Sequence, residues 1–282
     1  MYVLMCPCIL NPDLRARGIT KDSDLDMFSG AIERCRRFGL EIVPLPCPEC
    51  IYLGPDREPG TFLDRLDTEE FREFLLDLER EVREIIEKRG LPLCLVGVNS
   101  SPTCGVDTTY FGSHDGKSPK IPGRGTFLAR LSEIQAIDVG DFARYRLYLA
   151  APLFSRAEKL YNLSLNNLLT RSYYEVYLPQ DVGDDTHTRS LDEHRMIFES
   201  HVTALDEADA VVAVIDGADA DSGTSWEMGY AYSIGKPVYA IRTDFRMAGK
   251  KEKVNLMLEQ SSDVVTEEID LLSALKAPGA GR

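Results

Sequence analysis

The strongest constraint on the fold is an alternation of short apolar runs with longer amphipathic stretches, which occurs twice along the 282-residue chain. The short runs predict strands and the stretches between them predict helices, and strands that alternate with helices form parallel sheets. In the first half we expect strands at residues 2–5, 40–45 and 93–98, and helices near 22–38, 68–89 and 126–137.

The same pattern restarts near residue 141. Here we expect strands at 146–153, 174–179, 209–216, 237–242 and 263–265, and helices at 155–172, 191–208 and 223–235. The chain is therefore predicted to be an α/β protein with two domains, residues 1–140 and 141–282, each an open, mostly parallel sheet. Ligands of such sheets bind beyond the carboxyl ends of the strands, so the loops after strands are where site residues are sought.

The charge and hydropathy of the chain limit its partners. The formal net charge is −14 and the basic residues are scattered, which disfavours binding to duplex nucleic acid. No run of about 18 apolar residues predicts a membrane span, and the first residues lack the charged start and long apolar core of a secretory signal. We therefore expect a cytoplasmic protein that binds small molecules, with no duplex nucleic acid and no membrane among its partners.

The loop after the predicted strand 209–216 is acidic and leads directly into a predicted helix. It reads GADADSG at residues 217–223, with Asp221 ahead of the helix and Glu227 inside it. Gly223 lacks a side chain, which lets the backbone and a ligand approach closely. Acidic loops after strands are commonly just solvated, so these residues alone leave both a structural and a ligand-binding interpretation open.

Four segments of the second half resemble the nucleoside 2-deoxyribosyltransferase family. They are YLAAPLFSRAE, VYLPQD, LDEADAVVAVIDGADADSGTSWEMGYAYSIGKPV and VNLM, which follow in the family's order and spacing over most of residues 146–260. The nucleophile segment of the family is a Glu-(Met or Leu)-Gly-Tyr-Ala run with an Asp six residues before the Glu. In this chain these positions are Glu227 to Ala231 and Asp221.

The resemblance implies a flavodoxin-like fold and cleavage of the N-glycosidic bond of a nucleoside or nucleotide. Glu227 would attack C1′ of the sugar and form a glycosyl-enzyme, which a second base or water then displaces. Tyr148 would orient that carboxylate, and Asp221 would contact the sugar or the base. Asn255 matches the family asparagine that reaches a neighbouring subunit's site, which implies a homo-oligomer.

The chain departs from the family at one position. The family commonly has an Asp eight residues before the Asp that opens the third strand, and here that position is His201. Histidine can act as an acid near neutral pH, but the change puts base preference and transfer activity in question. Each residue also has a purely structural interpretation: His201 on a helix surface, Tyr148 at a strand end, Glu227 at a helix start and Asn255 as a helix cap.

Three cysteine-bearing segments of the first half each follow a predicted strand. They are CPCILN at 6–11, LPCPE at 45–49 and GVNSSPTCGV at 97–106. Because the carboxyl ends of parallel strands meet at one sheet edge, these thiols can converge. Cysteines of a cytosolic chain should be reduced, and convergent thiols favour a thiolate-bound metal or an iron–sulfur cluster.

These segments resemble the 2-thiouracil desulfurase (TudS-like) family, which carries a Cys in a CLLG or CILN turn, a Cys-Pro-Glu and a Ser-Pro-(Ser or Thr)-Cys-Gly. The likeness spans about residues 2–131, including PGRGTF at 122–127. It implies a [4Fe–4S] cluster held by Cys8, Cys47 and Cys104, whose fourth iron is open to the sulfur of a thiolated base. Ser101 and Glu49 are candidates for polar or proton-transfer roles.

The other four cysteines divide into two kinds. Cys6 and Cys50 lie close enough to the ligand positions to be spare ligands or sulfur acceptors. Cys35 and Cys94 lie on a helix face and within a strand, so they are interpreted as core residues.

Joining both halves, we expect a desulfidase-like domain fused to a deoxyribosyltransferase-like N-glycosidase, both acting on modified nucleobases or nucleosides. Two alternatives stay open. One is a nucleotide N-hydrolase whose first domain is a scaffold, and the other is a sensor that binds a nucleoside or nucleotide without turnover.

Overall fold

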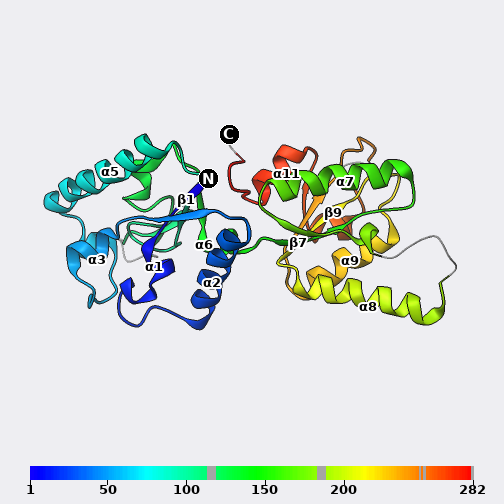
Figure 1. Cartoon of the computed structure of the whole chain (residues 1–282), viewed down its shortest axis with the longest axis horizontal. Coiled ribbons are helices and arrows are strands. Elements are labelled where there is room, and N and C mark those ends of the chain that lie inside the picture. The colour runs from blue at the N-terminus through cyan, green and yellow to red at the C-terminus, as the bar shows by residue number, and fades with distance from the viewer. Residues whose placement is uncertain (113–118, 183–188, 248, 250–251, 281–282) are drawn as a thin grey trace. The chain divides into compact units, whose positions relative to one another are not determined.

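The computed structural model describes residues 1–112, 119–182, 189–247, 249 and 252–280 (Figure 1). It divides into two compact units, one of residues 1–143 and one of residues 144–280. Each unit is an α/β layer structure, which confirms the predicted fold class. In the described part of the chain, no helix is both long and apolar enough to cross a membrane.

The N-terminal unit is built on a four-stranded sheet in which every neighbouring pair is parallel. Its strands, in spatial order, are β2 (Glu41–Pro44), β1 (Tyr2–Met5), β3 (Leu95–Gly97) and β6 (Ala136–Asp138). Its helices are α1 (Pro7–Leu10), α2 (Asp22–Arg37), α3 (Pro48–Leu53), α4 (Phe62–Arg65), α5 (Glu69–Arg89) and α6 (Val139–Ala143). The longest, α5, begins where the Thr68 hydroxyl accepts the Phe71 N–H and ends before Gly90, as capping chemistry predicts.

Residues 126–137 are not the helix that their apolar spacing predicts. They contain a 3₁₀ turn, η2 (Leu128–Leu131), and the start of β6. The N–H groups of Thr126 and Phe127 bond to the carbonyls of Pro102 and Thr103, and the Gln135 carbonyl accepts the Leu95 N–H. Pairing with distant segments therefore takes the backbone groups that a helix would use. An antiparallel hairpin, β4 (Thr108–Tyr110) with β5 (Lys120–Pro122), completes the unit.

The C-terminal unit has a five-stranded parallel sheet. Its strands, in spatial order, are β11 (Asp263–Val265), β10 (Val238–Ile241), β9 (Ala210–Val214), β7 (Arg146–Ala150) and β8 (Glu175–Tyr177). Numbered within the unit, the order is 5-4-3-1-2, which is the flavodoxin-like order 2-1-3-4-5 read from the other edge. The helices are α7 (Arg156–Arg171), α8 (Leu191–Glu207), α9 (Ser222–Ser233), α10 (Leu256–Gln260) and α11 (Glu268–Ala274).

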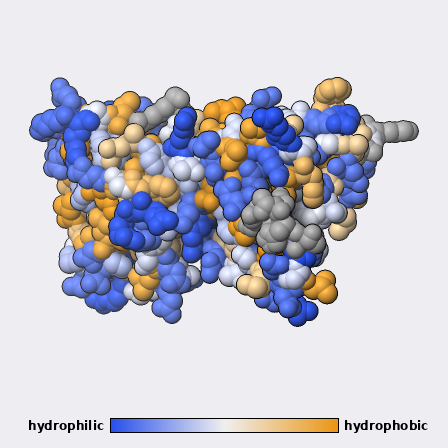
Figure 2. Space-filling model, turned by 45° about the vertical axis from the view of Figure 1, so that its right-hand side comes forward, coloured by the Kyte–Doolittle hydropathy of each residue, from blue (hydrophilic) through white to orange (hydrophobic). Residues whose placement is uncertain are grey.

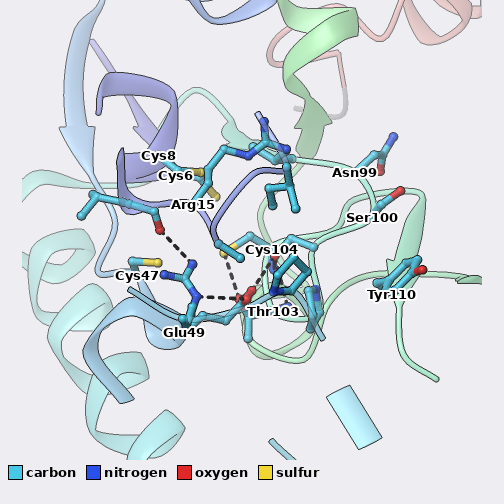
Figure 3. A pocket seen from close by; sticks show the side chains of 18 of the residues that line it. Cys6, Cys8, Arg15, Cys47, Glu49, Asn99, Ser100, Thr103, Cys104 and Tyr110 are labelled. Carbon is cyan, nitrogen blue, oxygen red and sulfur yellow. Dashed lines mark hydrogen bonds and ion pairs between the residues drawn. The ribbon is translucent and has the colours of Figure 1, made fainter. Parts of the chain in front are cut away.

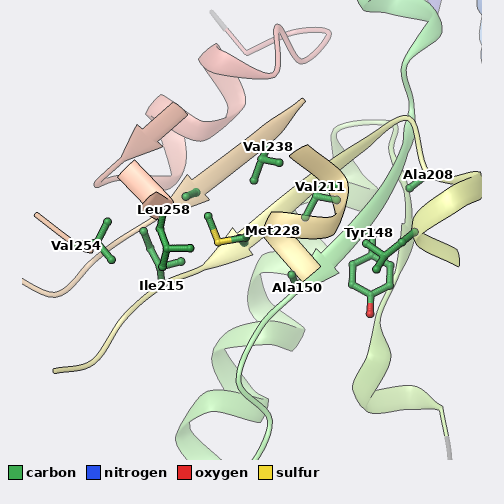
Figure 4. Close-up of a cluster of buried hydrophobic side chains, with 13 residues drawn as sticks. Tyr148, Ala150, Ala208, Val211, Ile215, Met228, Val238, Val254 and Leu258 are labelled. Atoms are coloured by element: carbon green, nitrogen blue, oxygen red, sulfur yellow. The ribbon is translucent and has the colours of Figure 1, made fainter. Parts of the chain in front are cut away.

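Alternation along the strands decides which helices cover each face of this sheet. Tyr148 and Ala150 of β7 pack with Leu205 of α8 and Met228 of α9 in one buried cluster (Figure 4). Because successive strand residues point to opposite faces, α8 and α9 share the face of Tyr148. On the face that Figure 2 shows, hydrophobic residues are scattered among hydrophilic ones. Among the described residues, Phe245 is the most exposed large hydrophobic residue, at 94%.

Candidate functional sites

In the C-terminal unit, the central contact joins Tyr148 of β7 and Glu227 of α9. The Tyr148 hydroxyl donates a hydrogen bond of 2.5 Å to Oε1 of Glu227. Burial, followed by the nearby Glu227 carboxylate, raises the pKa of Tyr148 well above its ordinary range, so the phenol keeps its proton and is the donor. The ring is fully buried, and its hydroxyl fixes the direction of the carboxyl group.

The surroundings of Glu227 oppose its negative charge. Burial raises the pKa of its carboxyl from an ordinary value of 4.5 to about 7, the Tyr148 hydrogen bond works against that rise, and repulsion from Asp221 adds to it. A half-buried, poorly solvated carboxylate held by one donor is a stronger nucleophile than a carboxylate in water.

Asp221 and Gly223 form the start of α9. Oδ2 of Asp221 accepts the Thr224 N–H at 2.9 Å, so Asp221 is the N-cap of the helix that carries Glu227. A Cβ added at Gly223 would lie 3.1 Å from the same carboxylate oxygen. This turn therefore sets the position of Asp221 and of the first turn of the helix.

His201 and Asn255 lie on other elements of the unit. His201 is on α8, half-buried, with Nδ1 3.0 Å from the Tyr177 hydroxyl. Asn255 is exposed, and its side-chain oxygen accepts the Met257 N–H at 3.0 Å as the N-cap of α10. Tyr177, which the sequence analysis did not single out, stacks on Tyr148 with ring centroids 5.3 Å apart.

In the N-terminal unit, a cavity of about 400 Å³ lies at the carboxyl ends of β1, β2 and β3. Cys8, Cys47 and Cys104 all line it, and Cys6 is a fourth thiol in its wall (Figure 3). The segments that bear them follow three adjacent parallel strands, which is why residues nearly 100 positions apart in sequence meet. Cys50 does not line the cavity, while Cys35 and Cys94 are buried in the core.

The surroundings of the cavity destabilise the negative charge of a thiolate. Burial raises the pKa of the Cys47 thiol to about 12 and that of the Cys8 thiol further, and Cys104 adds to both shifts. A hydrogen bond with Cys104 and burial raise the pKa of the Cys6 thiol. Bound metal ions deprotonate thiols and compensate their charge, so this set of thiols is suited to a metal-bound state.

Four thiols line this one cavity, and those of Cys6 and Cys104 are hydrogen-bonded to each other. Among the described residues, no group of three or more His, Cys, Asp and Glu side chains is arranged to hold a single metal ion. A single zinc ion needs every sulfur about 2.3 Å from one centre, whereas cysteines of an iron–sulfur cluster bind different iron atoms. The cavity lined by Cys8, Cys47 and Cys104 has a volume of about 400 Å³, which leaves room for a group whose iron atoms are bound by different cysteines.

Glu49 forms the polar wall of the same cavity. Its Oε1 accepts hydrogen bonds from the Ser101 hydroxyl at 2.9 Å and the Thr103 hydroxyl at 3.0 Å. Its Oε2 lies 3.7 Å from Nε of the buried Arg57. These contacts fix the carboxylate, and Ser101 also accepts the Cys104 N–H at 3.0 Å, which ties Glu49 to a predicted ligand loop.

The loop of Cys104 is held by close backbone contacts. Gly125, from the PGRGTF segment, donates its N–H to the Gly105 carbonyl at 2.9 Å. A Cβ at Gly125 would lie 2.4 Å from the Thr103 carbonyl carbon, so only glycine fits there. Asn99 was also missed from sequence: its Oδ1 accepts three backbone N–H groups, from residues 106, 107 and 108.

The chain is similar in sequence or in structure to several known proteins. An uncharacterized protein of Methanocaldococcus jannaschii is 32% identical over 101 residues, which are 35% of this chain and 63% of that relative, so the match spans less than two thirds of its length. The 2-deoxyribosyltransferase of Bacillus psychrosaccharolyticus is 22% identical, with 46% of this chain and 95% of that one covered and a TM-score of 0.40. A [4Fe-4S]-dependent thiouracil desulfidase is 18% identical, with 49% and 89% covered and a TM-score of 0.34.

A family model gives the assignment of the second half. Residues 147–264 match the model described as Nucleoside 2-deoxyribosyltransferase. The matched range contains β7, β8, β9 and α9, and with them Tyr148, His201 and Glu227. This match confirms the resemblance predicted from the nucleophile segment, and it places the similarity to the nucleoside 2-deoxyribosyltransferase family in the C-terminal unit of the chain.

Proposed function

We propose that the C-terminal unit cleaves the N-glycosidic bond of a nucleoside or nucleotide through a covalent intermediate on Glu227. The observation that carries the proposal is the Tyr148–Glu227 hydrogen bond of 2.5 Å beneath a half-buried carboxylate. The carboxylate forms a bond to C1′ as the C1′–N bond breaks, and the base leaves with the electron pair. A second base or water then releases the sugar, which gives transfer or hydrolysis.

The test of this activity uses the full chain and a panel of nucleosides and nucleotides. Release of free base, followed by chromatography, should occur with the wild type and fall at least about 1,000-fold in Glu227→Ala. Intact mass spectrometry should detect a sugar adduct on wild type and none on the variant. Base exchange with an added second base identifies a transferase, and free sugar alone identifies a hydrolase. Binding without any base release in the wild type would instead support a sensor.

We also propose that the N-terminal unit holds a [4Fe–4S] cluster through Cys8, Cys47 and Cys104 and removes sulfur from a thiolated nucleobase. Support comes from the lining of one cavity by these three thiols. When bound, such a cluster supplies an open iron position with affinity for sulfur. In this proposal Glu49, which accepts hydrogen bonds from Ser101 and Thr103, takes a proton from the water that replaces sulfur on the base carbon.

The cluster proposal has a direct measurement. Anaerobically purified protein should be brown, with about four irons per chain, as ligation of this type implies. A thiolated base incubated with it should release one sulfide for each oxo base formed, since the C–S bond is exchanged for a C–O bond without net oxidation. Colourless, iron-free protein after anaerobic reconstitution would rule the cluster out.

Homo-oligomer formation is a further part of the proposal. Asn255 begins α10, and two apolar side chains that follow it are exposed, Leu256 by 54% and Met257 by 75%. The proposal rests on the match of Asn255 to the family asparagine that reaches a neighbouring subunit's site, and a second subunit would cover these two side chains. Light scattering on the eluting protein should give a mass that is a multiple of one chain, and a monomer at micromolar concentration would contradict it.

A further inference from the structure

Four side chains from four elements form one continuous row in the C-terminal unit. Glu227 accepts the hydrogen bond from Tyr148, Tyr148 stacks on Tyr177 at an interplanar angle of 18°, and the Tyr177 hydroxyl lies 3.0 Å from Nδ1 of His201. The row follows from strand register, because Tyr148 and Tyr177 are direct partners in the parallel pair of β7 and β8. Side chains of paired residues lie on the same face of a sheet.

The surroundings favour one direction for the hydrogen bond between Tyr177 and His201. The Ser200 hydroxyl, 3.3 Å from the Tyr177 oxygen, can donate to it and leave the phenol proton for Nδ1. Burial lowers the pKa of His201, so the neutral ring, with one acceptor nitrogen, is the state near pH 7. Among the described residues, none bonds the other ring nitrogen, Nε2.

We propose that Tyr177 is a positioning residue that holds His201 in the tautomer with its proton on Nε2, and that this N–H donates a hydrogen bond to the departing base. The inference rests on the proposed glycosidic activity and deepens it. As Glu227 bonds to C1′, the base leaves with the electron pair of the C1′–N bond, and its negative charge spreads over ring nitrogens and exocyclic oxygen or sulfur. The neutral imidazole stabilises that charge without giving up its proton, and water protonates the base afterwards.

This arrangement predicts a substrate preference. A donor at position 201 matches a base that presents an acceptor there, a carbonyl or thione, whereas an amino group would leave two donors facing each other. A carboxylate at the same position would accept a hydrogen bond and prefer an amino group. The cost of a mismatched polar pair is commonly a factor of about 10 to 100 in kcat/KM. The unit should therefore favour oxo or thio bases over amino bases.

The first test is the tautomer of His201 in the full chain. ¹⁵N NMR of histidine-labelled protein at pH 8, with His201 assigned by its loss in His201→Asn, should show the proton on Nε2. Tyr177→Phe keeps the ring that stacks on Tyr148 and removes only the hydroxyl, so it should give a mixture of tautomers. Tyr161→Phe is the matched control, because the Tyr161 hydroxyl bonds to Glu268 and not to the row. A proton on Nδ1 in the wild type overturns the proposal.

The second test compares a uracil with a cytosine nucleoside. The wild type should prefer uracil by about 10-fold or more in kcat/KM. Tyr177→Phe should lose most of that preference, and His201→Asp should reverse it, while Tyr161→Phe leaves it unchanged. Equal preference in wild type and His201→Asp contradicts the proposal. If no nucleoside or nucleotide is cleaved at all, the glycosidic activity fails, and the tautomer measurement still decides the role of Tyr177.

Discussion

The proposed role of Glu227 as a nucleophile requires a negative charge that burial of this residue destabilises. Burial holds its pKa near 7, above the 4.5 of an exposed glutamate, so the folded protein binds this proton more tightly than the unfolded chain. Folding stability is therefore lost as the pH rises from about 4.5 to about 7 and stays reduced above that range. Strained or desolvated groups of this kind are common where activity requires them.

Replacement of this carboxyl by an amide should stabilise the protein and abolish its chemistry. Glu227→Gln keeps an oxygen for the Tyr148 hydroxyl and removes the buried charge. We expect the free energy of unfolding to rise by about 1–3 kcal/mol at pH 8, after allowance for partial exposure, and to match the wild type at pH 4.5. Denaturant unfolding at both pH values measures this. Glu199→Gln, an exposed position on α8, is the control and should change little.

The same pKa sets the pH dependence of base release. The nucleophile must be ionised, so kcat/KM should rise about 10-fold per pH unit below pH 7 and level off above it. Tyr148→Phe removes the donor that favours the charged form, so its rising limb should move to higher pH. The measurement is the pH–rate profile of both proteins. A wild-type limb centred near 4.5 would mean that Glu227 is solvated during the reaction.

At the scale of elements, sequence patterns predicted most of the strands and helices that position the candidate site residues. The strands β1, β2, β3 and the helix α9 follow from apolar runs and capping residues, so the loops of Cys8, Cys47 and Asp221 could be located. Register was not predictable, because the pairing of Tyr148 with Tyr177 depends on how β7 and β8 align. Neither was the segment 126–137, whose helical spacing was overridden by backbone bonds to distant residues.

Asp221 lies at the start of α9, and its role as the helix cap can be separated by substitution from a contact with a ligand. Asp221→Ala removes the cap on the Thr224 N–H and should cost about 1 kcal/mol, whereas Asp221→Asn keeps a capping oxygen and should cost a few tenths. If Asp221 also contacts the sugar or base, both variants should lose about 10-fold or more in kcat/KM. Thr68→Ala, which uncaps α5 in the other unit, is the control for stability alone. Full activity in Asp221→Asn would leave Asp221 a cap only.

The segment that packs on the Cys104 loop should be as important for iron binding as Cys104 itself. In Gly125→Ala, the new Cβ would meet the Thr103 backbone at 2.4 Å, so the loop must move. We expect a loss of about 1–3 kcal/mol in stability and a marked drop in iron bound per chain. Gly229→Ala adds a Cβ that meets nothing within 4 Å and serves as the control. Normal iron content in Gly125→Ala would show that the cluster does not need this loop position.

At the scale of the whole molecule, each site lies within one unit. The residues around the cavity fall in residues 1–143, and the row from Glu227 to His201 falls in residues 144–280. The net charge of −14 is spread over the chain and favours neither unit as a binding surface for duplex nucleic acid. The two proposed reactions therefore use different residues, each set lying within one unit.

Because the two proposed sites lie in different units, we expect a substitution in one site of the intact chain to abolish the activity of that site and to leave the other activity unchanged. Cys47→Ser should abolish bound iron and sulfide release while base release from an unmodified nucleoside stays within about twofold of wild type, because additivity holds for distant, independent positions. Glu227→Gln should do the reverse and retain about four irons per chain. Cys50→Ser, a cysteine outside the cavity, is the matched control for the thiol substitution. If Cys47→Ser stops base release from an unmodified nucleoside while the thermal unfolding of the protein is unchanged, the two units must share a reaction step, and the assignment of one activity to each unit is wrong.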